Sequence, residues 1–455
     1  MSNSELISNP KETFWKLATP LLVLSIFEAG YSFVDVFWVS QMNPESFFAI
    51  GVAVPLVTLI CGFGKSLGVG TNSLISREIG EGNIDITYNS ILHGVVACFV
   101  LGCIIMLSTL FLPNILVLMG ATSSMDLSMQ YLTPIFLCPF VFLFSNLFVS
   151  TLQAEGNSRT TTIILIFTNI LNLILDPIFI FVFNWGVTGV SYATILSSLV
   201  TTIYLLYWYL SGKTKVVLNF KYFKPGILYQ IFIVAIPNFL TDSLGCILSL
   251  FFNKILILQL GQIGVLLYST GMRIQSLIVS PQKAFSRALL TVSGHLYGAK
   301  KLDELKEIYT YVLKISISIA LITTVVFFFI RDYGFALFSV TGAETSVFYI
   351  SLAAIILIPF SEISEMSEKV LDGMGKSYYA LALTVGTIIY EILLVSLLEP
   401  IFTSGLCVLL GILIGEVTLA IIYYVIFRHL AKRHGKIKKP KTIYGYSFKN
   451  QNAYQ

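Results

Sequence analysis

Two places in the sequence put an acidic side chain where lipid-soluble residues otherwise dominate. Asp35 stands in the run FVDVFWVSQM at 33–42, and Asp176 stands in NLILDPIFIF at 172–181. An ionised carboxylate at the centre of a bilayer costs at least about 2.5–3.5 kcal/mol on insertion scales. We therefore expect both acids to face a partner, a cation or water, with a purely structural pairing as the alternative.

The second acidic position belongs to a polar stripe. Asn169, Asn172 and Asp176 fall at i, i+3 and i+7, which is one face of a helix. Pro177 lacks an N–H and clashes with the preceding turn, so it frees the carbonyl of Leu173 and bends the helix. Oxygen ligands of this kind suit Na⁺ or a shared proton rather than a transition metal. Two neighbouring carboxylates cannot both stay charged cheaply, so proton and Na⁺ would compete for one site.

The elements that must position these residues are membrane helices. The chain of 455 residues is 56% hydrophobic and 11% charged, with a mean hydropathy of +0.84, whereas a soluble domain carries roughly 25% charged residues. Its apolar segments are about 20 residues long, which suits a helix crossing a hydrocarbon core of roughly 30 Å. We predict an all-α integral membrane protein with twelve transmembrane helices, near 15–40, 47–70, 88–112, 131–153, 160–184, 187–211, 228–258, 263–290, 308–331, 345–371, 377–400 and 404–428.

Several other classes of protein are disfavoured by simple patterns. The start of the chain lacks a small-residue cleavage motif, so we expect the first helix to be retained. The six cysteines lie scattered in apolar stretches and form no CxxC pair or Cys/His cluster, which predicts neither a disulfide nor a structural metal site. Most of the net charge of +4 comes from the basic run at 428–441, which fits anionic lipid better than nucleic acid. We expect a monomer in contact with membrane lipid.

The distribution of basic residues predicts the orientation. An even number of spans puts both termini on one side, and the positive-inside rule makes the side richer in Lys and Arg cytoplasmic. Arg331 is almost alone on the opposite side, beside acidic residues such as Glu45, Asp126, Asp332, Glu344 and Glu399. The side of the termini holds Lys11, Lys16, Arg77, Arg159, Lys213, Lys215, Lys221, Lys224, Lys300, Lys301, Lys306, Lys376 and the basic run. We predict a multi-pass protein of the cell membrane with both termini in the cytoplasm.

One extended polar joint near the middle divides the chain. We predict an N-terminal six-helix bundle at 1–212, a cytoplasmic linker at 213–226, a C-terminal six-helix bundle at 227–430 and a basic cytoplasmic tail at 431–455. Three pairs of residues recur at separations of 218, 219 and 217: Gly80 with Gly298, Gly156 with Gly375, and Pro20 with Pro237. Such a repeat indicates two similarly oriented bundles, a plan that secondary transporters use.

Taken together, these features resemble the multidrug and toxic compound extrusion (MATE) family. The resemblance rests on the two-by-six organisation, the FVDVFWV run, the glycine turns after helices 2, 4, 8 and 10, and the NLILDPIFIF run. It covers nearly the whole chain up to the basic tail and is strongest toward the archaeal and DinF-like branch, whose cation site lies in the N-terminal bundle. It implies a secondary active multidrug efflux antiporter, which couples entry of Na⁺ or H⁺ to export of amphipathic, often cationic organic compounds without another cofactor.

The resemblance also implies where the site lies. It carries the cation or proton site onto Asp35, Asn172, Asp176 and Thr194, where Na⁺ would be held, and it makes Tyr131 and Asn146 polar neighbours in the substrate cavity. For Asn172 and Thr194 the alternative is hydrogen bonding between helices. For Tyr131, and for Tyr31 in the first helix, the alternative is simple packing, because 14% of the chain is aromatic.

The first helix contributes further candidates. Glu28 lies two helical turns before Asp35, at a position where the family more often has glutamine, so it adds a third acid to the predicted cavity. Tyr31 lies about one turn from both acids and can stack on an organic cation. Asn169 completes the polar lining. We expect Pro20, and Pro177 in the fifth helix, to act as hinges.

The C-terminal bundle gives weaker signals. Asp242 lies five residues after Pro237, which is not the spacing of the helix-7 acid in the other bacterial MATE branch, so no site is carried over. We expect the intramembrane charges Arg273 and Glu391 to pair across the bundle. The acids near the end of the tenth helix have the spacing of a hydrated face: Glu362, Glu365 and Glu368, with Lys369 and Asp372 beyond.

The alternatives to a multidrug antiporter are an enzyme, a lipid-linked saccharide flippase and a cation channel. No GxxxxGK[ST], HExxH or GxSxG motif is present, and four scattered histidines make no site, so an enzyme is disfavoured. We expect His295 to be solvated. A lipid-linked saccharide flippase of the same superfamily would usually line its cavity with Arg and Lys to hold a pyrophosphate. In a cation channel, Asp35 and Asp176 would gate the ion, but the internal repeat and the broken helices favour alternating access.

Overall fold

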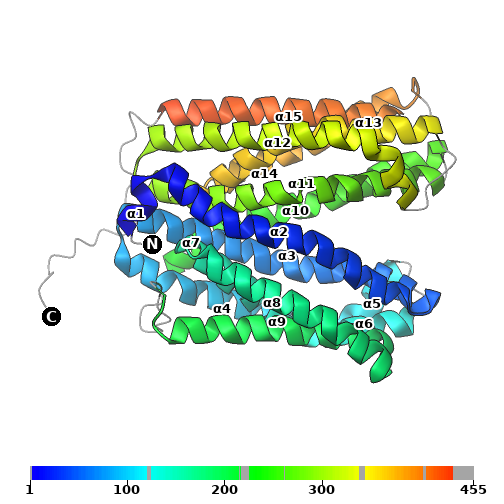
Figure 1. The fold of residues 1–455 in the computed structure, drawn as a ribbon, viewed down its shortest axis with the longest axis horizontal. Helices are drawn as coiled ribbons and strands as arrows, with labels where there is room; N and C mark the ends of the chain where they lie inside the picture. Colours follow the sequence, from blue (N-terminus) through cyan, green and yellow to red (C-terminus); the bar gives the residue numbers. More distant parts are fainter. Residues whose placement is uncertain are drawn as a thin grey trace, which may run out of the picture.

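A computed structural model describes residues 3–119, 124–214, 216, 225–260, 262–337, 344–402 and 406–433. Most of the predicted linker and the basic tail from 434 onward lie outside these residues. The described residues are mostly helical, and no strand is found among them. The helices lie side by side in two groups, with the first half of the chain in one group and the second half in the other (Figure 1).

The helices of the first half are α1 (Asn3–Ser8), α2 (Pro10–Ser40), α3 (Pro44–Glu81), α4 (Ile84–Ser108), α5 (Leu112–Leu118), α6 (Met125–Leu137), α7 (Pro139–Ala154), α8 (Ser158–Pro177) and α9 (Gly186–Leu210). Those of the second half are α10 (Pro225–Leu260), α11 (Gln262–Gly298), α12 (Leu302–Leu337), α13 (Glu344–Gly373), α14 (Ser377–Leu398) and α15 (Leu406–Arg433). Among the described residues, eight helices are long and apolar enough to cross a membrane, and a bent pair makes a ninth. The chain is therefore a multi-pass membrane protein.

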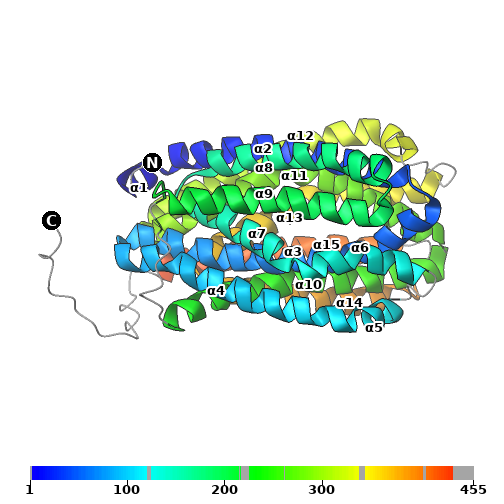
Figure 2. The same cartoon turned by 90° about the horizontal axis from the view of Figure 1, so that it is seen from below.

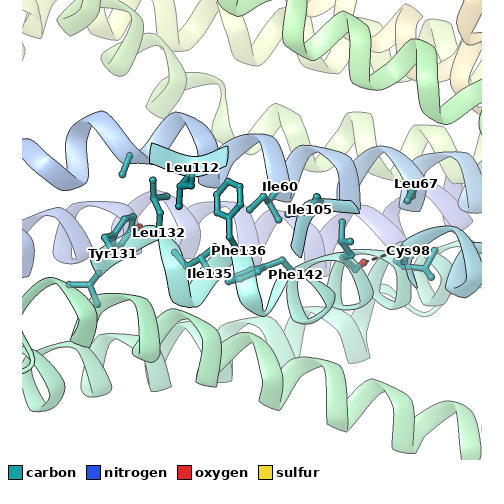
Figure 3. Packing of buried hydrophobic residues seen from close by; sticks show 14 of the residues in the cluster. Ile60, Leu67, Cys98, Ile105, Leu112, Tyr131, Leu132, Ile135, Phe136 and Phe142 are labelled. Carbon is teal, nitrogen blue, oxygen red and sulfur yellow. Dashed lines mark hydrogen bonds between the residues drawn. The ribbon is translucent and has the colours of Figure 1, made fainter. Parts of the chain in front are cut away.

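The bent pair corrects one predicted boundary. The sequence predicts a single fourth helix near 131–153, but the structure has α6 and α7, bent by 55° across Cys138. Pro139 causes the break, because it lacks an N–H and stands at the first turn of α7. The bend lies beside the core of the first half, where Phe136 and Phe142 on either side of it are buried with Ile60 and Leu132 (Figure 3).

The first long helix connects the two halves. The stretch of α2 from Phe14 to Leu24 is buried against α11 and α12, in a cluster with Phe285 and Leu289. Farther along, α2 packs on α8, which belongs to its own half. In both views α2 lies beside α8 and α11 (Figures 1 and 2). A change in the first part of α2 therefore acts on the fit between the halves.

The internal repeat is visible where α3 and α11 end. A β-carbon at Gly80 would overlap the backbone of His295, and one at Gly298 would overlap the backbone of Arg77. The sequence predicts turns at Gly80 and Gly298, but both lie inside or at the last residue of a helix. Their role is close approach, because only a residue without a side chain lets the two backbones touch.

The two other repeated glycines do occupy turns. Gly156 and Gly375 have φ values of 88° and 73°, the left-handed conformation that glycine adopts without strain. Each turn is followed by a helix two residues later, since α8 begins at Ser158 and α14 begins at Ser377. The two halves therefore share the register of these helices, with an offset of 219 residues.

Candidate functional site

The two acids singled out by the sequence meet in the structure. Asp35 comes from the second part of α2 and Asp176 from the end of α8, and their carboxyl groups hydrogen-bond to each other. Asp176 is buried, with 1% of its surface exposed, whereas Asp35 is partly exposed. Because two carboxylates in contact repel each other when both are charged, this pair is suited to hold a proton or a cation between them.

Polar groups surround the acid pair on one side. The hydroxyl of Tyr31 donates a hydrogen bond to Oδ1 of Asn172. The Nδ2 of Asn172 lies 3.5 Å from Oδ1 of Asp176, at the limit of a hydrogen bond. Tyr131 is buried within reach of the charges of Asp35 and Asp176. The stripe predicted on one helix is thus completed by side chains from α2 and α6.

One acceptor of this cluster lacks a partner. The Oδ2 atom of Asp176 is buried and makes no hydrogen bond to the described residues. No Lys, Arg or His of the described chain forms an ion pair with Asp35 or Asp176. A buried acceptor without a partner costs free energy. The oxygen donors therefore fit a proton or Na⁺.

Other predicted site residues bond to their own helices. The Oγ1 of Thr194 donates to the carbonyl of Val190 at 2.9 Å, and the Nδ2 of Asn146 donates to the carbonyl of Phe142 at 2.9 Å. Asn146 also packs on α3 at Gly64, so its amide lies in a contact between helices. Asn169 is partly buried one turn before Asn172 on α8.

The two predicted hinge prolines differ in their local structure. Pro177 ends the regular part of α8, and a π-helical turn at 178–182 follows, in which the N–H of Phe183 donates to the carbonyl of Ile178 at 2.9 Å. Such turns often mark functional sites. Pro20 lies inside α2, which runs without interruption from Pro10 to Ser40.

Two pairs of opposite charge join the halves. Glu28 of α2 lies 3.8 Å from Arg287 of α11, so the third acid faces a base of the other half. Lys65 of α3 lies 3.0 Å from Asp242 of α10, again across the halves. All four side chains are between about one third and one half exposed, from 37% to 52%. Sequence reasoning missed Lys65, a single basic residue in a run rich in glycine.

A buried network corrects the prediction for the end of the tenth helix. Glu368 and Asp372 both pair with Lys369, at 2.6 and 3.2 Å, and Asp372 is fully buried. Asp372 also accepts hydrogen bonds from Asn238 of α10 at 3.1 Å and from Ser377 at 2.5 Å. The predicted hydrated face is wrong, because the acids point into the protein and obtain partners there.

Burial also contradicts the prediction for the rest of this face and the prediction that His295 is solvated. Glu362 is fully buried, with neither carboxyl oxygen hydrogen-bonded among the described residues, while Glu365 accepts from Ser286 at 2.8 Å. His295 is fully buried, and its Nε2 lies 2.9 Å from the carbonyl of Ala154 across the halves. The side chains of Arg273, Arg331, Asp332 and Glu344 lie outside the described residues, so the predicted pairing of Arg273 with Glu391 stays a prediction.

Comparison with known sequences places the chain among transporters. The profile of the MatE family matches residues 20–178 and 234–397. The multidrug export protein MepA of Staphylococcus aureus is 26% identical over 353 residues, which cover 68% of this chain and 78% of the relative. MepA of Staphylococcus saprophyticus is 27% identical over 265 residues, covering 55% of this chain and 58% of the relative. These relatives support multidrug efflux.

Comparison with solved structures identifies the same fold. A MOP superfamily transporter from Pyrococcus furiosus, described as having a binding pocket of reversed polarity, has a TM-score of 0.90 and 26% identity over 96% of this chain and 99% of its own. A MATE transporter in a straight conformation has a TM-score of 0.89 and 26% identity over 94% and 98%. These likenesses confirm the predicted twelve-helix, two-lobe fold. Because the family profile matches most of its length, the chain belongs to the MATE family of membrane transporters and is not an enzyme.

Proposed function

We propose that this chain is an antiporter, which exports amphipathic, often cationic compounds and takes its driving force from Na⁺ or H⁺ entry. The observation that supports it best is the contact between Asp35 and Asp176, in which one buried oxygen has no partner among the described residues. A coupling ion must bind in one conformation and leave in another. A carboxyl pair satisfied only by a proton or cation meets that requirement.

The residues around the pair have distinct roles in this proposal. Asp35 and Asp176 hold the charge of the ion, and Asn172 supplies an amide oxygen, which Tyr31 now occupies by donating its hydroxyl hydrogen. Thr194 and the carbonyl freed near Pro177 would complete a shell of oxygens for Na⁺. Proton binding needs only the carboxyl pair. One site therefore serves either ion, and the two ions exclude each other.

Closure between the halves supports an alternating-access mechanism. The ends of α3, α11 and α13 meet through small residues, and the hydroxyl of Ser73 donates to the carbonyl of Asp372 across the halves. With the termini placed in the cytoplasm, this closed end is the cytoplasmic one. The structure then represents a state that releases substrate outward. A related MATE transporter is known in straight and bent conformations, and we place the bend of this chain in α2, near Pro20.

A flippase receives less support from the same geometry. Lys65 and Arg287 do lie between the halves, as a pyrophosphate carrier would require. Each is paired with an acid, however, so their charge is not available to an anion without breaking a bridge.

The proposal is tested by efflux from proteoliposomes loaded with a fluorescent cation. A gradient of Na⁺ or of protons, imposed separately, should drive export in the wild type. Loss of coupling in Asp35→Asn would support the site, whereas equal export by both proteins would refute it.

A further inference from the structure

A salt bridge joins the two halves far from the ends of their helices. Lys65 of α3 lies 3.0 Å from Asp242 of α10, and the two side chains are 52% and 41% exposed. Lys65 stands 16 residues before Glu81, the last residue of α3, which is about 24 Å along a helix. Charged side chains at such a depth face protein or a water-filled cavity rather than lipid. The exposed bridge therefore borders a space between the halves.

The bridge lies where the buried contact between α3 and α10 gives way to exposed side chains. On the cytoplasmic side, the buried hydroxyl of Ser66 donates to Oδ1 of Asn238 at 3.2 Å. Beside the bridge, the rings of Phe63 and Phe239 stack across the halves with centroids 3.9 Å apart, and both rings are partly exposed. Two opposite charges and an aromatic surface thus adjoin one another at the same level of the two helices.

The other contact between the halves ends in a similar way. The stretch of α2 from Phe14 to Leu24 is buried against α11, and one turn later Glu28 lies 3.8 Å from Arg287. In this pair the first half supplies the acid, whereas in the other pair it supplies the base. Each half therefore presents one acid and one base to the space between them.

Paired charges of both signs favour a ligand that carries both signs. A ligand with only a positive charge would take Asp242 and leave Lys65 without its acid, and a ligand with only a negative charge would leave Asp242 without its base. An ion that loses its partner in a poorly solvated place costs free energy. A ligand with both charges gives each residue a new partner and leaves neither charge alone.

Movement of the halves makes the bridge available to such a ligand. Opening toward the cytoplasm separates α3 from α10, so it must break the bridge and the hydrogen bond between Ser66 and Asn238. Closing brings Lys65 and Asp242 back to each other, and the re-formed bridge competes with whatever they have bound. The same two residues can therefore bind a substrate in one conformation and release it in the other.

We propose that Lys65 and Asp242 bind zwitterionic aromatic substrates. The cationic group of the substrate takes the place of Lys65 beside Asp242, its carboxylate takes the place of Asp242 beside Lys65, and its ring packs on Phe63 and Phe239. The inference rests on the proposed antiport for the opening toward the cytoplasm, and it names a substrate class for it. Its binding step is measurable without transport.

The experiment compares two dyes that differ in one charge. One is a rhodamine with a carboxylate beside its cationic ring system, and the other is its methyl ester, which keeps the cation alone. Binding to purified full-length protein in nanodiscs is measured by fluorescence polarisation, with no ion gradient. Wild type should bind the free acid about tenfold more tightly than the ester. Lys65→Gln should abolish this preference, because glutamine offers the carboxylate no charge, whereas Asp242→Asn should weaken both dyes.

A matched control breaks another bridge between the halves. Lys11 of α2 lies 2.7 Å from Glu307 of α12, near the start of the chain, and Lys11→Gln should keep the wild-type preference. The double variant Lys65→Gln with Asp242→Asn leaves neither charge unpaired, so it provides a second test if a single variant fails to fold. It should bind both dyes equally and more weakly than wild type binds the free acid.

Two results would overturn the proposal. One is equal binding of the two dyes by wild type, and the other is an undiminished preference for the free acid in folded Lys65→Gln or in the double variant. Gradient-driven efflux by Asp35→Asn tests the antiport separately and requires no difference between the dyes. Either proposal can therefore fail alone.

Discussion

Two buried aspartates, Asp372 and Asp176, differ in how many hydrogen-bond and ion-pair partners the protein gives them. Asp372 has an ion pair with Lys369 and hydrogen bonds from Asn238 and Ser377. Asp176 has only Asp35, a long contact with Asn172 and one oxygen without a partner among the described residues. Complete partnering is expected of an acid that holds helices together, whereas an incomplete set leaves room for an ion. The difference supports a structural role for the cluster around Asp372 and the proposed ion binding for the cluster around Asp176.

The largest expected effect comes from changing the unsatisfied acid. Asp176→Asn removes the ionisable group with almost no change in shape, so gradient-driven efflux should fall at least about 100-fold, as expected when a charge essential for coupling is lost. The amount of folded protein, measured by size-exclusion chromatography, should stay unchanged. Efflux near the wild-type rate would mean that Asp176, like Asp372, has a structural role and does not bind the coupling ion.

Changing Asp372, whose carboxyl oxygens have partners, should lower the stability of the fold. Asp372→Ala leaves Lys369 with Glu368 as its one remaining acid and leaves the donors of Asn238 and Ser377 without their acceptor, which should cost about 3–5 kcal/mol of folding free energy. A clear fall in the midpoint of thermal unfolding in detergent checks this. Lys16→Met breaks the exposed pair with Glu12 at 2.6 Å, and as a control it should change stability by no more than about 1 kcal/mol. If both variants unfold at the same temperature, the network around Asp372 does not stabilise the protein.

The contact between α3 and α11 should affect turnover. Gly298→Ala places a methyl group against the backbone of Arg77, so closure at this end becomes strained and we expect efflux to fall about tenfold, for a strain of about 1.4 kcal/mol. Gly51→Ala is the matched control, since a β-carbon there meets no atom within 4 Å. Equal rates for the two variants would show that the close approach of α3 and α11 does not limit transport.

A smaller effect is expected at the proposed bend. Pro20→Ala restores an N–H and removes the ring clash in α2, which should favour one conformation of the helix. Turnover should fall about threefold while equilibrium binding of a fluorescent drug stays nearly constant, a shift of roughly 0.7 kcal/mol in the conformational equilibrium. A proportional loss of binding and turnover would remove the support for a hinge.

The smallest effect is expected at the charge pair between the halves. Glu28→Gln leaves Arg287 without its acid, so export of a cationic dye should weaken about twofold, within the range of a screened pair. A neutral dye should change less, and adding Arg287→Gln should restore export of the cationic dye. If both dyes respond equally, Glu28 does not act through its charge.

The sequence predicts the two-lobe fold well and the site in part. Runs of about 20 apolar residues predict the helices, and the spacing of Asn172 and Asp176 predicts their shared face. The burial of Glu368 and Asp372 was not predictable, because acids at helical spacing near a helix end look the same whether they face water or a lysine of the same cluster.

The proposed binding of the coupling ion by Asp35 and Asp176 is tested by imposing each ion gradient separately. Proteoliposomes containing wild type or Asp35→Asn are loaded with a fluorescent cation, and a Na⁺ gradient or a pH gradient is imposed alone. We predict that at least one gradient accelerates export by the wild type and that neither accelerates export by Asp35→Asn. Export that is unaffected by either gradient in the wild type, or equally driven in Asp35→Asn, would contradict the claim.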